Sequence, residues 1–147
     1  MADQSPGLPP LTPATIQPFF DNFSEMAFHK YLGMHLVEYR DGYARVELHR
    51  TEHTPTGIGG SVHGGALATL VDMTAVTSVL AGLREGEHPA GTADIQLTYL
   101  RQTKGETVTC EAHVLKRGKQ LAPVEVKVTD DEGRLCCSAR VLYAFRA

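Results

Sequence analysis

The segment from His63 to Leu83 constrains the fold of this chain more than any other. It opens with His63-Gly64-Gly65 and contains no proline. Apolar residues recur in it at the spacing of one helix face, namely Leu67, Leu70, Val71, Ala75 and Val79. This pattern predicts one long helix that begins at the two glycines. The other patterned segments are shorter, so they must pack around this helix.

Six runs of alternating apolar and polar residues predict strands. Two precede the long helix, at 34–40 and 42–49, and the pair Asp41-Gly42 between them is a tight-turn signal. Four follow it, at 90–101, 106–116, 121–130 and 134–145, and we expect the loops between them to be hairpin turns. A first helix is expected near 13–27, capped by Thr12 or Thr15. The order predicts an α+β fold in which an antiparallel sheet wraps around the long helix.

Length and composition exclude several classes of protein. The 147 residues suit one domain, expected at 13–147 behind a flexible arm at 1–12. No apolar run reaches the roughly 18 residues of a membrane span, and the net charge of −3 argues against a nucleic-acid partner. The first residues do not resemble a secretory signal, so we expect a cytoplasmic protein. Neither the three cysteines nor the histidines have the spacing of metal ligands, and no metal is predicted.

Asp72 is the one carboxylate inside the predicted long helix. A lone carboxylate among apolar residues is costly unless something uses it. At the helix start, the N–H groups of Gly64 and Gly65 have no helical partners and lie at the positive end of the dipole, which suits an anion or a carbonyl oxygen. Two simpler interpretations stay open. Asp72 could belong to a solvated polar face, and the glycines could serve close packing.

Three motifs give the chain a specific resemblance to a known family. They are His63-Gly64-Gly65 followed by Leu70-Val71-Asp72, the run 94–100, and the run 113–122. In this order they resemble hotdog-fold acyl-CoA thioesterases of the branch that includes the phenylacetate-degradation enzymes, over nearly the whole chain beyond about residue 27. The resemblance implies an antiparallel sheet around a long central helix. It also implies hydrolysis of an aryl- or medium-chain acyl-CoA, without a cofactor, by a homodimer or homotetramer.

The resemblance also implies roles for four residues. Asp72 would be the nucleophile or the general base, and the Gly64 N–H would polarise the thioester carbonyl. Thr92 matches a small hydroxyl residue that helps to place the water, although β propensity alone also explains a threonine there. His63 is expected chiefly to shape the loop, with a catalytic role as the alternative. The loop ahead of His63 lacks the Asn or Gln that the family tends to carry there.

Basic residues cluster between positions 101 and 119. By the same resemblance, the turn Lys116-Arg117-Gly118-Lys119 lies near the phosphates of coenzyme A, where cations and turn N–H groups suit a polyanion, and Arg101 is expected to contribute. A solvated hairpin tip is the simpler interpretation. Two rival functions remain on the same fold: a non-catalytic acyl-CoA-binding module, and a hydratase or dehydratase, which needs a histidine and an acid acting together.

The distance between the two proposed catalytic groups bears on assembly. Gly64 and Asp72 are eight residues apart, which places them about 12 Å apart along one helix. A thioester carbonyl must lie about 3 Å from both the polarising N–H and the attacking group. One helix can hardly supply both groups to one carbonyl. A two-fold dimer with antiparallel helices can, so we expect each active site to be shared between two chains.

Overall fold

The computed structural model describes residues 9–146, so Ala147 and most of the arm expected at 1–12 lie outside the described part of the chain. The elements occur in the order α1 (Gln17–Asp21), a 3-10 turn (Phe23–Glu25), α2 (Ala27–Leu32), β1 (Met34–Arg40), β2 (Tyr43–His49), a second 3-10 turn (Ile58–Gly60), α3 (Gly64–Leu80), β3 (His88–Tyr99), β4 (Thr107–Val114), β5 (Leu121–Thr129) and β6 (Leu135–Arg146). In this part of the chain, no helix is long and apolar enough to cross a membrane.

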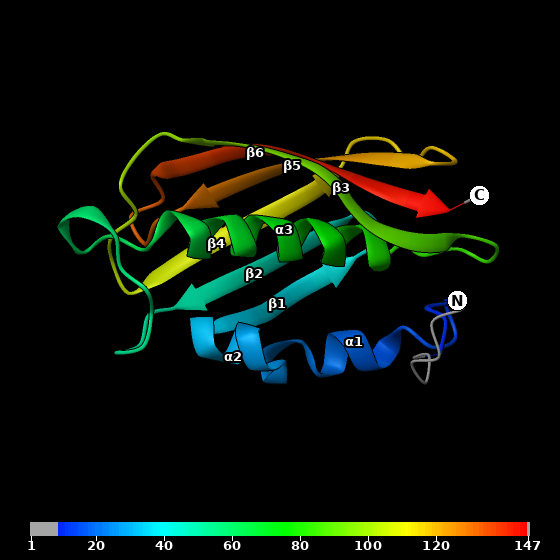
Figure 1. Cartoon of the computed structure of the whole chain (residues 1–147), viewed down its shortest axis with the longest axis horizontal. Coiled ribbons are helices and arrows are strands. Elements are labelled where there is room, and N and C mark those ends of the chain that lie inside the picture. The colour runs from blue at the N-terminus through cyan, green and yellow to red at the C-terminus, as the bar shows by residue number, and fades with distance from the viewer. Residues whose placement is uncertain (1–8, 147) are drawn as a thin grey trace, which may run out of the picture.

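The six strands form one antiparallel sheet in the order β1-β2-β4-β5-β6-β3, and α3 lies across one of its faces (Figure 1). Alternate side chains on the central strands point toward α3 and are fully buried, among them Ala44, Val46, Leu48, Val108, Cys110, Val124, Val126 and Val128. The predicted α+β architecture and the six predicted strands are therefore present. The strands alternate between apolar and polar residues because one face of the sheet is covered and the other is exposed.

One predicted connection is wrong. The loop at 102–105 is not a hairpin turn, because β3 pairs with β6 at one edge of the sheet while β4 pairs with β2 and β5. The chain therefore crosses over the sheet between β3 and β4. Length matching favours this arrangement, since β3 and β6 both have 12 residues and pair along almost all of them.

The first helix also differs from its prediction. Instead of one helix near 13–27, the structure has α1, a 3-10 turn and α2. The break falls at Asn22, whose side-chain and backbone N–H groups both donate to the Pro18 carbonyl. Thr15 does not cap α1, because its hydroxyl donates to the Pro10 carbonyl instead. The short pieces still bury Phe20 and Phe23 beside the core, as the predicted apolar face required.

Candidate active site

Asp72 lies at the middle of α3, half-buried, and faces β3. Its Oδ1 accepts a hydrogen bond of 2.6 Å from the hydroxyl of Thr92. Register irregularities flank Thr92 on both sides, between Pro89 and Gly91 and between Thr92 and Asp94. Bulges of this kind turn a side chain out of the regular pleat. The structure therefore brings together two residues that lie far apart in the sequence and that the resemblance had assigned to one reaction.

Tyr143 completes the surroundings of Asp72. It is the register partner of Thr92 on β6 and is 3% exposed. Burial, together with the nearby Asp72 carboxylate, raises the pKa of Tyr143 to about 12. The phenol therefore stays protonated throughout the physiological range. No sequence motif singled out Tyr143, because its proximity to Asp72 depends on the pairing of β3 with β6.

Asp72 does not belong to a solvated polar face. Four hydroxyl residues of α3 could make up such a face; Thr74, Thr77 and Ser78 are fully buried, and Thr69 is half-buried. All four donate their hydroxyls to carbonyls of α3 itself, at 2.6–3.0 Å. These polar side chains are therefore satisfied within the helix. Asp72 is the one charged side chain of α3, and a solvated polar face does not describe its surroundings.

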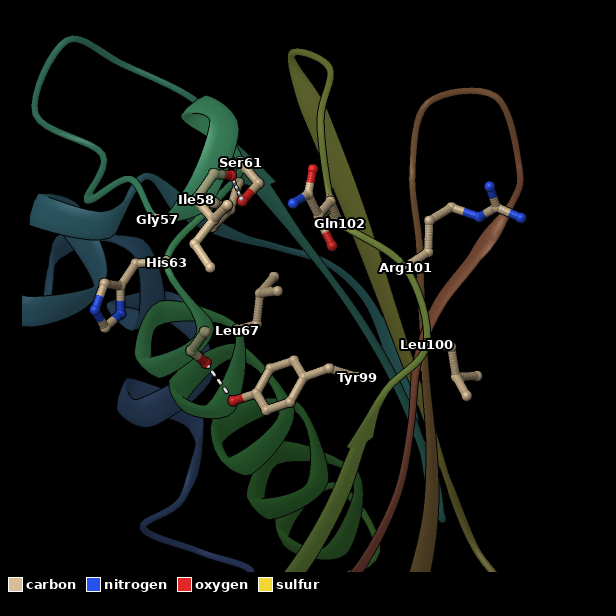
Figure 2. Close-up of a pocket in the computed structure, with 12 residues that line it drawn as sticks. Gly57, Ile58, Ser61, His63, Leu67, Tyr99, Leu100, Arg101 and Gln102 are labelled. Carbon is tan, nitrogen blue, oxygen red and sulfur yellow. Dashed lines mark hydrogen bonds between the residues drawn. The ribbon is translucent and has the colours of Figure 1, made fainter.

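The start of α3 is held by two side chains. The His63 ring accepts a hydrogen bond from the Gly65 N–H through Nδ1 at 2.9 Å and so caps the helix. The Tyr99 hydroxyl donates to the Gly64 carbonyl at 2.6 Å (Figure 2). A Cβ on Gly64 would lie only 3.3 Å from the Tyr99 ring, so glycine allows a close contact here that a larger residue keeps only if Tyr99 shifts. As the first residue of α3, Gly64 still has an N–H for which the helix supplies no acceptor.

A cavity of about 470 Å³ opens at this end of α3, and we call it the Gly64 cavity. Its lining includes Gly64, Tyr99 and the segment 100–103. Thr103 is 1% exposed, and its hydroxyl has no hydrogen-bond partner within residues 9–146. In Figure 2, Gln102 points toward the 57–61 loop whereas Arg101 extends away from it. The cavity therefore combines apolar walls with an amide and an unpaired buried hydroxyl.

A second cavity, of about 360 Å³, contains Asp72, and we call it the Asp72 groove. It is lined by Phe28 and His29 of α2, by Ala68, Thr69, Asp72 and Met73 of α3, and by Ile95 of β3. His29 is buried, and its Nδ1 lies 2.8 Å from the Phe23 carbonyl. A carbonyl only accepts, so Nδ1 carries the proton. Burial lowers the pKa of His29, with the Phe23 hydrogen bond opposing, so the ring is neutral at pH 7.

The predicted catalytic residues therefore fall into two separate places. Asp72 and Thr92 meet at the Asp72 groove, whereas Gly64 and His63 line the other cavity. Neither the Gly64 cavity nor the Asp72 groove contains both the carboxylate and the helix N-terminus. This separation is what the distance along the helix had predicted.

Comparison with known proteins now identifies the family. Residues 59–137 match the Thioesterase superfamily. The chain belongs to this superfamily. It is 35% identical over 116 residues to acyl-coenzyme A thioesterase 13 from Homo sapiens, a match that covers 77% of this chain and 81% of the human protein. Its fold resembles zebra fish thioesterase superfamily member 2, with a TM-score of 0.75 and 29% identity over 92% of this chain and 99% of that one.

The fold is also that of the PaaI protein from the phenylacetic acid degradation operon of E. coli, with a TM-score of 0.77 and 21% identity over 93% of this chain and 96% of that one. The predicted hotdog fold, family and enzyme class are therefore confirmed, and the protein is a thioester hydrolase of the Thioesterase superfamily.

The basic residues of this thioesterase do not form one cluster. Arg101 lies at the start of α3, whereas the turn 116–119 lies beyond its other end. Arg117 is 7% exposed, pairs with Glu87 at 3.0 Å and donates to the Val79 carbonyl in the last turn of α3. It therefore caps the helix from inside the protein, where a cation also complements the dipole. Lys116 and Lys119 of the same turn are exposed, as is Arg101.

Two further residues of the site were invisible in the sequence. The amide that the family tends to carry ahead of His63 is missing, but Gln102 approaches the same loop from the other side. A Cβ on Gly59 would lie 3.4 Å from the Gln102 Oε1. His29 reaches the Asp72 groove from α2, a segment predicted only to pack on the core. Among residues 9–146, no group of three or more His, Cys, Asp or Glu side chains could hold a metal ion.

Proposed function

We propose that this thioesterase hydrolyses aryl- or medium-chain acyl-CoA to the free acid and CoA. Asp72 acts as nucleophile or as general base on water, and the Gly64 N–H polarises the thioester carbonyl. The observation that carries the proposal is the state of Asp72. It is a lone carboxylate in an apolar helix, held on one oxygen by Thr92, and it lines an open groove. Such a group is oriented but not consumed by structural contacts.

The chemistry follows from this geometry. In the general-base form, Asp72 takes a proton from water as the water oxygen attacks the carbonyl carbon. The resulting oxyanion is stabilised by the N–H at the start of α3, where the helix dipole adds positive potential. The carbon–sulfur bond then breaks, and the CoA thiolate leaves and takes up a proton. In the nucleophilic form, Asp72 attacks the carbonyl itself, the carbon–sulfur bond breaks, and the CoA thiolate leaves and takes up a proton from solvent. Water then hydrolyses the resulting acyl anhydride, which releases the acid and regenerates the Asp72 carboxylate.

The proposed working unit is a homodimer, alone or within a dimer of dimers. A carbonyl that touches Gly64 of one chain and Asp72 of another requires a two-fold axis midway between these positions, near residue 68 of an antiparallel helix pair. Residue 68 is Ala68, which is small and only partly buried in one chain, so the helices can approach closely. β3 has 12 residues, and within residues 9–146 no strand pairs with its outer edge. Free edges of this length invite pairing with a second copy.

The same two-fold axis would bring basic residues from both chains to one CoA-binding site. It would place the 116–119 turn of the partner subunit beside the Gly64 cavity, because that turn lies past the far end of α3. Arg101, Lys116 and Lys119 could then surround the phosphates of one CoA, with the turn N–H groups around Gly118 as further donors. The Gly64 cavity has the exposed side chain of Gln102, whose amide suits the amide groups of the pantetheine arm.

The first experiment measures release of free thiol from a panel of acyl-CoAs by the purified protein. We expect turnover on aryl or medium-chain substrates. Tight binding of acyl-CoA without thiol release would contradict the proposal and favour a non-catalytic binding module instead.

The shared site has its own test. Asp72→Asn chains and Gly64→Val chains are unfolded and refolded together, after circular dichroism shows that each folds alone. Each parent should be nearly inactive. A mixed dimer holds one site with both lesions and one with neither, so roughly a quarter of all sites should recover under random pairing. No recovery, with mixed dimers present by mass spectrometry, would place both groups in one chain and overturn the shared site.

A further inference from the structure

We propose that the acyl group of the substrate lies in the Asp72 groove and that Phe28 of α2 selects which acyl groups fit. This inference rests on the proposed function, since it assumes that Asp72 acts at the thioester carbonyl. It adds a specificity-determining residue from a segment that carries none of the family motifs. It also assigns the two halves of the substrate to two different cavities.

The groove has the shape and lining of an acyl site. α3 lines the groove through Ala68, Thr69, Asp72 and Met73. The other two elements that line it, α2 and β3, lie on opposite sides of α3 in Figure 1. Phe28 contributes an aromatic wall from α2, and Ile95 contributes an aliphatic wall from β3. A volume of about 360 Å³ lies within the usual range of small-molecule sites, about 300–1,000 Å³. Apolar walls around one reactive carboxylate fit a hydrocarbon group attached to a carbonyl.

The polarity of the two cavities decides which half of the substrate goes where. The carbonyl carbon has two substituents, the acyl group and the sulfur of CoA. The Gly64 cavity offers the exposed polar side chains of Arg101 and Gln102, whereas the groove offers hydrocarbon and aromatic surface around Asp72. An acyl chain placed in the Gly64 cavity would remove water from the Gln102 amide without replacing its hydrogen bonds, which is costly. The acyl group therefore belongs in the groove.

Phe28 is held in place to form this wall. Its neighbour His29 is buried, packs on the Phe23 ring with centroids 4.3 Å apart, and bonds to the Phe23 carbonyl. Gly33, with a φ of +78°, ends α2 in the left-handed conformation and turns the chain into β1. These contacts fix α2, yet the Phe28 side chain remains 58% exposed. A large apolar side chain on a fixed short helix, open to a groove, is available to a ligand.

The same helix provides a matched control. Tyr31 is an aromatic residue of α2 with nearly the same exposure, 54%, but it does not line the groove. Phe28→Ala and Tyr31→Ala therefore remove comparable exposed rings from one helix, and only the first changes the proposed acyl wall. Phe28→Trp is the opposite change, because it enlarges the wall and narrows the groove. Since both side chains are exposed, all three variants should fold.

The experiment measures kcat/KM by thiol release for straight-chain acyl-CoAs of increasing length and for phenylacetyl-CoA. Each methylene that a pocket accepts or rejects changes kcat/KM by about 10-fold or more. Phe28→Ala should therefore raise the ratio of long-chain to short-chain kcat/KM at least about 10-fold and weaken any preference for the aryl group. Phe28→Trp should shift the ratio toward short chains, and Tyr31→Ala should leave the wild-type profile.

The outcomes separate the two proposals. A profile that Phe28→Ala and Phe28→Trp leave unchanged, in an active enzyme, would overturn the acyl assignment and leave the proposed function standing. Equal shifts in Phe28→Ala and Tyr31→Ala would also overturn it, because the effect would then come from α2 as a whole. A wild-type enzyme that releases no thiol from any acyl-CoA would overturn the proposed function and this inference together.

Discussion

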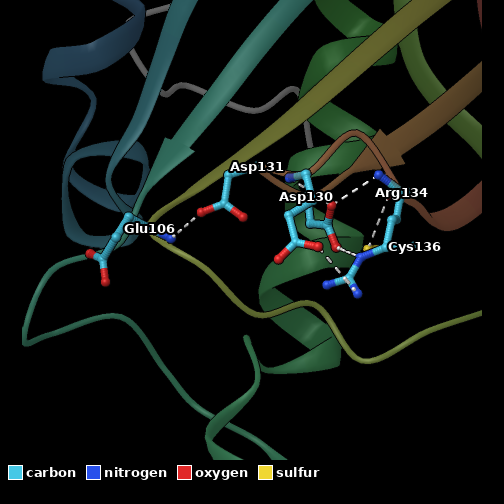
Figure 3. A network of polar contacts seen from close by, with 6 residues as sticks. Glu106, Asp130, Asp131, Arg134 and Cys136 are labelled. Atoms are coloured by element: carbon cyan, nitrogen blue, oxygen red, sulfur yellow. Dashed lines mark hydrogen bonds and ion pairs between the residues drawn. The ribbon is translucent and has the colours of Figure 1, made fainter.

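Two aspartates in this molecule show how differently the same side chain can be used. Asp130, at the end of β5, is 3% exposed and sits in a closed network in the turn to β6 (Figure 3). Its carboxylate accepts from the backbone N–H groups of Glu132 and Arg134 and from the Arg134 guanidinium, all at 2.8–3.0 Å. Asp72 is less buried, and within the described part of the chain it accepts one hydrogen bond, from Thr92.

The difference lies in what remains available for chemistry. Burial alone would raise the pKa of Asp130, but the hydrogen bonds from Arg134 and Glu132 outweigh it and hold the pKa below its usual value. Asp130 is thus fixed as an anion with its oxygens occupied. Asp72 is fixed at one oxygen and faces an open groove. A structural carboxylate is saturated with donors, whereas a working carboxylate is oriented and left partly free.

The largest effect is expected from Asp72→Asn. Asparagine keeps the size of the side chain and removes the negative charge, so the fold should persist while kcat falls by about 10²–10⁴-fold. Steady-state kinetics measures the loss of kcat, and circular dichroism on the same sample checks that the variant is folded. A wild-type kcat in a folded variant would show that Asp72 takes no part in the reaction. The proposed difference in role between Asp72 and Asp130 would then be wrong.

The contrast between the two aspartates was partly visible in the sequence. Asp72 stood out because a lone carboxylate interrupts an apolar helical run, and local spacing is enough to show that. Thr92 depended on the family resemblance, and Tyr143 and His29 could not be found at all. Tyr143 is brought near Asp72 by the pairing of β3 with β6, and His29 is brought to the Asp72 groove by the packing of α2, and neither follows from the local sequence.

The fold was also predicted only in part, because local patterns determine the strand positions but not the strand order. Strand positions follow from period-two patterns, which one covered face imposes on any sheet. Strand order does not, so the crossover after β3 was mistaken for a hairpin turn. The basic turn shows the limit most clearly. The sequence does not distinguish Lys116, Arg117 and Lys119 as basic residues of one turn. In the structure, Arg117 is buried against Glu87 and Val79.

A second prediction applies the contrast to that turn. Changing Lys116 and Lys119 together to Ala should raise KM for CoA thioesters about 10-fold through lost phosphate contacts, with little change in thermal stability. The effect on a short thioester without the nucleotide should be small. Arg117→Ala should do the reverse and mainly lower Tm, since it leaves Glu87 without its partner. Equal KM changes on both substrates would show that the two lysines do not contact the nucleotide.

A third prediction concerns Asp130 itself. Asp130→Asn keeps the shape but weakens three hydrogen bonds at the β5–β6 turn, so Tm should fall on the order of 5 °C. The kcat of the folded fraction should stay at the wild-type value, because the turn lines neither the Gly64 cavity nor the Asp72 groove. A large loss of kcat at unchanged Tm would mean that saturation with donors does not mark a structural carboxylate here.

The smallest effect is expected from His29, whose neutral imidazole lines the Asp72 groove. Burial is the main cause that lowers the pKa of His29 from 6.5 in the folded protein. Below about pH 6.5, therefore, His29 binds a proton in the unfolded chain but stays neutral in the folded chain. This contribution makes the free energy of unfolding fall as pH drops from 6.5 toward the lowered pKa of the folded state, by no more than about 1.4 kcal/mol per pH unit.

The variant His29→Gln can still donate to the Phe23 carbonyl and does not titrate. Urea unfolding at several pH values should therefore show a shallower acid loss in His29→Gln than in wild type. Ala27→Gln, an exposed change in the same helix, should keep the wild-type slope. Identical slopes in wild type and His29→Gln would mean that the imidazole gains its proton as readily in the folded protein, and the groove would then present a cation to the acyl group at acid pH.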